Sequence, residues 1–205
     1  MNNAELQEQN TNPKQLTTLI EQHKLLQIIS SISRKLLAIR SNDNFGRVVQ
    51  DCLSLLGESM SKNRIYIWKC RVDSDGRDYC LKLYRWSSEN NCANDGAPNK
   101  LFYDEFPAFR AIANGDKCLN RLSRDFAASE RAILERQGTK AILIAPIAIS
   151  GKLWGFINVD NGEAEQLFSS VEESMLMLSG SLLANAIENM ETDAALREAE
   201  ERTQL

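Results

Sequence analysis

Residues 140–160, KAILIAPIAISGKLWGFINVD, decide the fold of this chain. They hold two apolar runs, Lys140–Ile149 and Leu153–Asp160, whose β-branched and aromatic side chains favour strands over helices. The tight-turn sequence Ser150-Gly151-Lys152 stands between the two runs. The segment therefore predicts an antiparallel β-hairpin, with Pro146 bending the first of its strands.

A second hairpin is predicted upstream of the first. Arg64–Cys70 is rich in β-branched and aromatic residues, Asp73–Gly76 is a turn sequence, and Tyr79–Trp86 supplies the return strand. A loop sequence rich in Asn, Ser, Asp, Gly and Pro follows over Ser87–Asn99. Cys118–Leu122 is a further, short candidate strand.

Helical periodicity surrounds both hairpins. Apolar residues recur at three- and four-residue steps from Pro13 to Ile39, from Phe45 to Leu56 and from Phe168 towards Leu205. We expect two shorter helices, one N-capped by Asp104 and one over Ser129–Gln137. At the start of the last long helix, Ser169 with Glu172, or Ser170 with Glu173, predicts a capping box. This order of elements predicts an α+β fold, in which helices flank a central antiparallel β-sheet.

The composition is that of an ordinary globular domain. The chain has 205 residues, of which 43% are hydrophobic and 25% charged, and its formal net charge is −4. These values argue against wholesale disorder and against a broad nucleic-acid-binding surface. The longest apolar run, Ala141–Ile149, is too short to cross a bilayer, and the polar N-terminus does not read as a signal peptide. We therefore expect a cytoplasmic protein, with neither nucleic acid nor membrane as a partner of this segment.

The cysteines predict neither a metal site nor a disulfide framework. There are five of them, none in a C-x-x-C pair, and the chain has a single histidine, His23. We expect reduced thiols and no metal ion. Cys70 and Cys80 flank the predicted turn of the upstream hairpin and can face each other across it; we interpret them as ordinary strand residues.

Six stretches of the chain carry a family resemblance through their order and spacing. They are Asn63–Trp68, Tyr84–Trp86, Tyr103–Pro107, Glu130–Gly138, Ala145–Ile147 and Gly151–Asp160. Together they resemble the GAF domain family, the small-molecule-sensing modules of bacterial signalling proteins. The resemblance covers roughly Ile29 to Ile187. It implies a GAF-like antiparallel sheet with long N- and C-terminal signalling helices.

The resemblance also implies a division of the chain. Residues 1–28 are expected to be an N-terminal linker helix, residues 29–187 the GAF domain, and residues 188–205 a coiled-coil-like C-terminal linker helix. The tail Leu196–Leu205 resembles the helical linker that precedes a PAS or histidine-kinase region. We therefore expect a regulatory segment without enzymatic activity. It would belong to a two-component sensor histidine kinase, with covalently linked PAS or kinase domains as partners.

Strand alternation limits the residues that could line a ligand pocket. Arg64, Tyr66, Trp68 and Cys70 share one face of their strand, and we assign that face to the pocket because it carries polar groups. The expected pocket combines aromatic walls with a few convergent polar groups, a pattern typical of small-molecule sites. Its candidate residues are Tyr66, Trp68, Trp86, Tyr103, Phe106, Phe109, Trp154 and Asn158. The competing interpretation is that these rings fill the core.

The specialised ligands of GAF subclasses fit poorly. The residue types of the cyclic-nucleotide signature occur in Asn99–Glu105, but there they are compressed into seven residues. No cysteine precedes a histidine, so no bilin attachment site is expected and no cofactor is predicted. The GAF domains that reduce free methionine sulfoxide carry reactive cysteines around the pocket entrance, later in the fold than Cys70 and Cys80.

Apolar stripes on the two terminal helices predict a parallel homodimer. Their residues are Leu25, Ile32, Ile39, Leu183, Ile187 and Met190. The leading hypothesis is a sensory GAF domain that binds an unidentified small molecule and relays the signal through these helices. A ligand-free dimerisation and relay module is the alternative, which a fully packed core would favour. A cysteine-based free methionine sulfoxide reductase is a third, weaker hypothesis.

Overall fold

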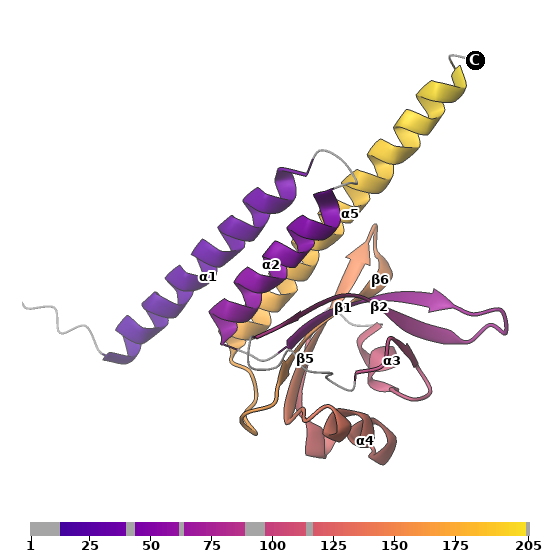
Figure 1. Ribbon diagram of the computed structural model, residues 1–205. Coiled ribbons are helices and arrows are strands. Elements are labelled where there is room, and N and C mark those ends of the chain that lie inside the picture. The colour runs from indigo at the N-terminus through magenta and orange to yellow at the C-terminus, as the bar shows by residue number, and fades with distance from the viewer. Residues whose placement is uncertain (1–12, 40–43, 62–63, 89–96, 114–116, 204–205) are drawn as a thin grey trace, which may run out of the picture.

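The computed structural model describes residues 13–39, 44–61, 64–88, 97–113 and 117–203 (Figure 1). Cys92 and the first twelve residues of the predicted linker helix lie outside the described residues. Where the chain is described, no helix is both long enough and apolar enough to span a membrane.

One antiparallel sheet of six strands organises the molecule. The strands are β1 (Arg64–Val72), β2 (Asp78–Ser87), β3 (Lys100–Phe102), β4 (Leu119–Leu122), β5 (Ala141–Ile149) and β6 (Lys152–Asn161). Their order across the sheet is β3-β2-β1-β6-β5-β4. Both predicted hairpins are present, and they join where β1 pairs with β6, Tyr66 lying opposite Asn158. The short strand β3 had no counterpart in the sequence analysis.

Helices cover both faces of this sheet, which confirms the predicted α+β fold (Figure 1). Three long helices, α1 (Pro13–Leu37), α2 (Phe45–Met60) and α5 (Ser170–Thr203), form a bundle on one face. Two short helices, α3 (Ala108–Ala113) and α4 (Ala128–Arg136), lie on the other. The helices α1 and α5 run in the same direction, and α5 continues past the end of the bundle (Figure 1).

The sheet separates two hydrophobic cores. Ile65 and Ile67 of β1 point into the first core, between the sheet and the three-helix bundle. Tyr66 and Trp68 point into the second core, beneath α3 and α4. This alternation is the one the sequence predicted for β1, because successive side chains of a strand face opposite sides of the sheet.

Trp86 and Trp154 were predicted to line the pocket with Tyr66 and Trp68, but two register shifts place them on the other face of the sheet. The pairing of β1 with β2 shifts between Ile67 and Trp68, and that of β5 with β6 shifts between Ile147 and Ala148. An extra residue in a strand reverses the facing of the residues beyond it. Trp86 and Trp154 therefore pack against the first core, on the opposite side of the sheet from Tyr66 and Trp68.

Of the N-caps predicted for α3 and α5, only that of α5 is confirmed. The predicted cap of α3 is wrong: Asp104 is exposed and pairs with Arg110 at 3.0 Å, while the N–H of Ala108 donates to the Glu130 carboxylate at 2.7 Å. At α5, Ser169 and Glu172 form the predicted capping box, the N–H of Ser169 donating to the glutamate at 2.7 Å.

Candidate functional site

The second core gathers six of the eight predicted pocket residues. They are Tyr66, Trp68, Tyr103, Phe106, Phe109 and Asn158. The ring of Phe109, on α3, stacks on Phe156 of β6, with ring centroids 4.8 Å apart and an interplanar angle of 11°. The rings of Trp68 and Tyr103 lie 6.3 Å and 5.9 Å from that of Phe109. The side chains of α3 and of the segment before it thus close over the sheet.

The cavity left between these rings is small. Its volume is about 20 Å³, close to the space that one water molecule occupies. Its lining residues are Tyr66, Trp68, Leu101, Phe106, Phe109, Ile133, Leu134, Gln137, Ile142, Ile144 and Asn158. Among the described residues, the second core is therefore filled by its own side chains.

The contribution of α4 to this cavity was not predicted from the sequence. Ile133, Leu134 and Gln137 reach it from the end of that helix. The apolar spacing of α4 predicts a buried face, but no local signal says which sheet face receives it. Leu101 was missed because it belongs to the unpredicted strand β3.

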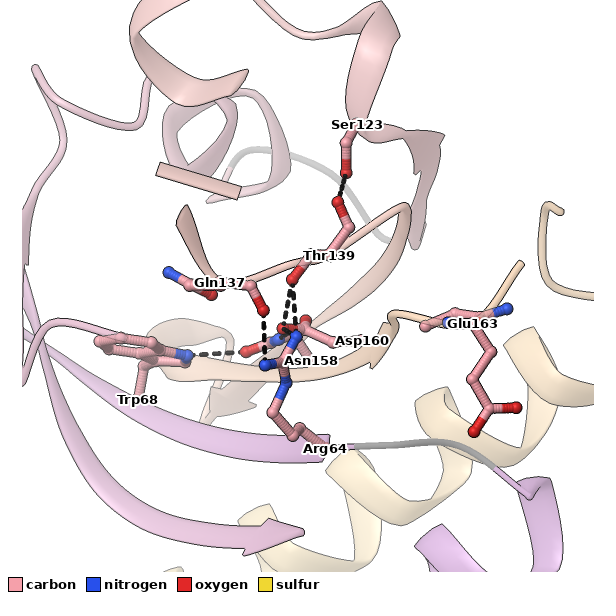
Figure 2. Close-up of polar contacts among 9 residues, drawn as sticks. Arg64, Trp68, Ser123, Gln137, Thr139, Asn158, Asp160 and Glu163 are labelled. Carbon is pink, nitrogen blue, oxygen red and sulfur yellow. Dashed lines mark hydrogen bonds and ion pairs between the residues drawn. The ribbon is translucent and has the colours of Figure 1, made fainter. Parts of the chain in front are cut away.

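The rings of Trp68, Tyr103, Phe106, Phe109 and Phe156 form the aromatic cluster of the second core. Buried hydrogen bonds connect this aromatic cluster to the centre of the sheet (Figure 2). The indole N–H of Trp68 donates to Oδ1 of Asn158 at 2.7 Å. The amide Nδ2 of Asn158 donates in turn to Oδ1 of Asp160, also at 2.7 Å. Trp68 is therefore fixed in orientation by its polar atom as well as by its ring.

Asp160 is the centre of this polar network. Its Oδ2 accepts from the hydroxyl of Thr139 at 3.0 Å and lies 3.7 Å from Nη2 of Arg64. Both charged side chains are almost fully buried, at 6% exposure for Arg64 and 1% for Asp160. Arg64 also donates to the carbonyl of Gln137 at 2.6 Å, which holds the end of α4 against β1 (Figure 2).

A thiol pair lies at the edge of the aromatic cluster. The Sγ atoms of Cys70 and Cys80 are 3.7 Å apart, and the hydroxyl of Tyr103 donates to Cys70 at 3.1 Å. Hydrogen bonding with Cys80 lowers the pKa of Cys70, although burial opposes the shift. Burial raises the pKa of Cys52 and of Cys118 to about 11.

The two tryptophans of the first core have separate surroundings. The ring of Trp86 packs against Gly57 of α2. The ring of Trp154 lies beneath the ammonium of Lys69, 5.0 Å from its centroid. Neither indole can line the cavity of the second core.

Three of the six predicted dimer residues are buried within the chain itself. Ile32, Leu183 and Ile187 are 2%, 5% and 3% exposed and belong to the first core. The prediction that these three residues contact a partner helix is wrong, because the sheet and the neighbouring helices of the same chain already cover them. Leu25, Ile39 and Met190 are half-buried at its margin.

A groove on the bundle lies between α1 and α5. This groove has a volume of about 510 Å³. Ser33 and Leu37 line it from α1, and Leu182, Asn185 and Asn189 line it from α5. Leu36 of the first core lines the groove as well, together with Ala186 and Met190, which pack against that core.

The described residues offer little for catalysis by metal ions. Among them, no three His, Cys, Asp or Glu side chains come together as a metal site would require. Buried hydrogen bonds connect the side chains of Trp68, Asn158, Asp160, Thr139 and Arg64.

Comparison with known proteins agrees with this architecture. A curated relative, the methanogenesis regulatory histidine kinase FilI of Methanothrix harundinacea, is 29% identical over 181 residues. The aligned region covers 87% of this chain but only 20% of that kinase.

Two solved structures share the fold at low identity. The phycoerythrobilin-bound GAF domain of a cyanobacterial phytochrome aligns with a TM-score of 0.61 at 15% identity, over 85% of this chain and 97% of that one. The GAF domain of an Acinetobacter phosphoenolpyruvate-protein phosphotransferase aligns with a TM-score of 0.58 at 17% identity, over 83% and 97%. Residues 44–187 match the family described as GAF domain. The chain thus belongs to the GAF domain family.

Proposed function

We propose that this chain is the signalling module of a sensor histidine kinase, and that it dimerises and transmits through α1 and α5. The histidine kinase relative supports a place in a larger signalling protein. In that protein, PAS or kinase domains would be covalently linked to this segment, and the whole would act in a cytoplasmic phosphorelay. The groove between α1 and α5 is the observation that carries the proposal. The filled second core favours a relay module that needs no ligand.

Both walls of the groove continue as heptad-spaced stripes. On α1, the outward-facing stripe follows alternating steps of three and four residues: Leu16, Leu19, His23, Leu26, Ser30, Ser33 and Leu37. On α5, a matching stripe is Leu178, Leu182, Asn185, Asn189, Thr192 and Leu196. Such spacing keeps a stripe facing a partner helix that has the same repeat. On each helix, this outward-facing stripe lies on a different face from the residues that enter the first core.

A second copy of the chain is the partner that these stripes fit. A two-fold axis parallel to α1 and α5 would set each stripe against its own copy, as isologous interfaces require. The leucines are strongly exposed for their type: Leu26 is 65% and Leu37 is 70% exposed. Asn185 and Asn189 stand within the α5 stripe, where polar residues specify the register of paired helices at some cost in stability.

Analytical ultracentrifugation of the 205-residue chain and of Leu37→Glu tests this assembly. We expect the wild type to dimerise at tens of micromolar, and Leu37→Glu to weaken the dimer by about tenfold or more, because the interface would bury two carboxylates. Val72→Glu is the matched control. Val72 is also an exposed aliphatic residue, at 62% exposure, but it lies on the β1–β2 hairpin and not on α1 or α5. Its replacement by glutamate should therefore leave the dimer unchanged. A monomeric wild type at these concentrations contradicts the proposal.

Small-molecule sensing is the second candidate function. Asn158, Gln137 and the Trp68 indole place polar groups around the small cavity, as a recognition site requires. A ligand larger than water would have to displace α3 or α4, since about 20 Å³ is available.

Urea unfolding of Trp68→Ala distinguishes the two candidates. If the ring packs as described, at 5% exposure, its removal should lower the free energy of unfolding by about 3–5 kcal/mol. Trp86→Ala, a half-buried ring of the first core, is the control and should cost less. A loss under about 1 kcal/mol for Trp68→Ala, together with a small molecule retained in native mass spectrometry, would instead support an open ligand site.

A further inference from the structure

Two cysteines lie directly opposite each other near the tip of the β1–β2 hairpin. Cys70 and Cys80 are register partners, and their sulfur atoms are 3.7 Å apart. Opposed residues of antiparallel strands have Cβ atoms about 4.5–5.5 Å apart, whereas a disulfide needs about 3.5–4.5 Å. The sulfurs can therefore be joined by a local approach of the two strands of about 1 Å, without refolding.

The two thiols have different surroundings. Cys70 is half-buried and takes part in two hydrogen bonds, one with Cys80 and one from the hydroxyl of Tyr103. Cys80 is fully buried. The hydrogen bond with Cys80 lowers the pKa of Cys70, whereas the same bond and burial raise the pKa of Cys80. Cys70 is thus the thiol that ionises first and that an oxidant can reach.

We propose that Cys70 and Cys80 are a dithiol pair that peroxides oxidise reversibly to an intrachain disulfide. The Cys70 thiolate attacks one oxygen of the peroxide, the O–O bond breaks, and Cys70 becomes a sulfenic acid while hydroxide leaves. The sulfur of Cys80 then attacks Cys70 and displaces the sulfenic hydroxyl. The proton of Cys80 leaves with that hydroxyl as water. With hydrogen peroxide, two thiols are oxidised and one peroxide is reduced to two waters.

Tyr103 links this chemistry to the aromatic cluster. Its hydroxyl donates to Cys70, and its ring lies 5.9 Å from Phe109 and 6.5 Å from Phe156. A disulfide sulfur is a weaker acceptor than a thiolate, and moving Cys70 towards Cys80 changes the position of that acceptor. The redox state of the pair thus acts on the ring packing that closes the second core.

Peptide mapping of the wild-type chain after treatment with hydrogen peroxide tests the proposal without any substitution. We expect one intrachain disulfide between Cys70 and Cys80, reversed by dithiothreitol. Cys118 is the internal control: it is also half-buried, but burial raises its pKa to about 11. Its oxidation should be at least about tenfold slower, because the thiolate is the reactive form. Equal rates at the two sites, or Cys70 oxidised without the cross-link, overturn the proposal.

Two variants assign the roles within the pair. Cys80→Ser should trap Cys70 as a sulfenic acid that dimedone labels, because no resolving thiol is left. Tyr103→Phe keeps the ring and removes the hydroxyl, and should slow the reaction of Cys70 by about three- to tenfold. Tyr79→Phe, on the same hairpin with its ring against Phe102, is the matched control and should leave the rate unchanged. In Cys70→Ser, dimedone labelling of Cys80 as fast as Cys70 is oxidised in the wild-type chain would contradict this assignment.

Discussion

Asp160 shows how one buried side chain organises the candidate site. It accepts hydrogen bonds from Asn158 and Thr139 and faces the guanidinium of Arg64. Through Asn158 it orients Trp68, and through Arg64 it is connected to the end of α4. A carboxylate buried in this way is stable only because each of its neighbours supplies a donor or a positive charge.

Asp160→Asn should therefore destabilise the protein strongly. The substitution removes the counter-charge of Arg64, which stays buried, and the expected loss in the free energy of unfolding is about 3–5 kcal/mol. Asp104→Asn is the control, since its ion pair with Arg110 is exposed on both sides and should contribute less than about 1 kcal/mol. Urea unfolding measures both variants. Equal small losses would mean that the network does not organise the core.

Strand β6 is the element on which both cores depend. Its central residues pair with β1 on one side and β5 on the other. Gly155 lies opposite Lys69, next to the register shift that turns Trp154 towards the helices. A Cβ atom at this position would collide with the backbone carbonyl of Trp68, so the close approach of β1 and β6 requires glycine.

Gly155→Ala should separate β1 from β6 locally. We expect a loss of about 3 kcal/mol or more in the free energy of unfolding, because backbone rather than a movable side chain blocks the methyl group. Gly46→Ala is the matched control: its nearest side-chain atom is 3.7 Å away, in ordinary contact. Alanine in α2 should be neutral or stabilising by up to about 1 kcal/mol. A thermal melt that ranks the two variants equally would contradict the steric account.

The whole molecule is two cores separated by one sheet. The bundle of α1, α2 and α5 lies on one face of the sheet, and α3 and α4 lie on the other (Figure 1). The bundle carries the groove proposed for dimerisation, and the opposite face carries the aromatic cluster. β1, β5 and β6 contribute side chains to both cores, so these three strands connect the packing on the two faces of the sheet.

Dimerisation through the groove should make thermal stability depend on concentration. If the folded dimer dissociates on unfolding, a tenfold increase in protein should raise Tm by about 1–3 °C. Leu37→Glu should reduce this dependence while the Tm at low concentration stays close to that of the wild type, because Leu37 is exposed within one chain. Calorimetry at two concentrations measures the effect. A concentration-independent Tm for the wild type contradicts the assembly.

Local pattern predicted much of the fold. Strand runs such as Arg64–Cys70, turns such as Ser150-Gly151-Lys152 and the helical period of Phe45–Leu56 all appear as expected. These features depend on neighbours within a few residues, which the order of side chains specifies directly. The short strand Lys100–Phe102 was missed because its pairing with β2, not its own composition, makes it a strand.

By itself, the sequence determined the α+β class, the two hairpins, the capping box of α5 and the face shared by Tyr66 and Trp68. The tertiary structure alone decided the facing of Trp86 and Trp154, because a register shift depends on how two strands meet. It also decided which apolar stripe of each terminal helix enters the core. Ile32 and Leu26 both fit a helical period, but only packing shows that the first is buried and the second exposed. The space left between the rings of the second core was likewise decided by packing, since it depends on side chains from strands and helices far apart in the chain.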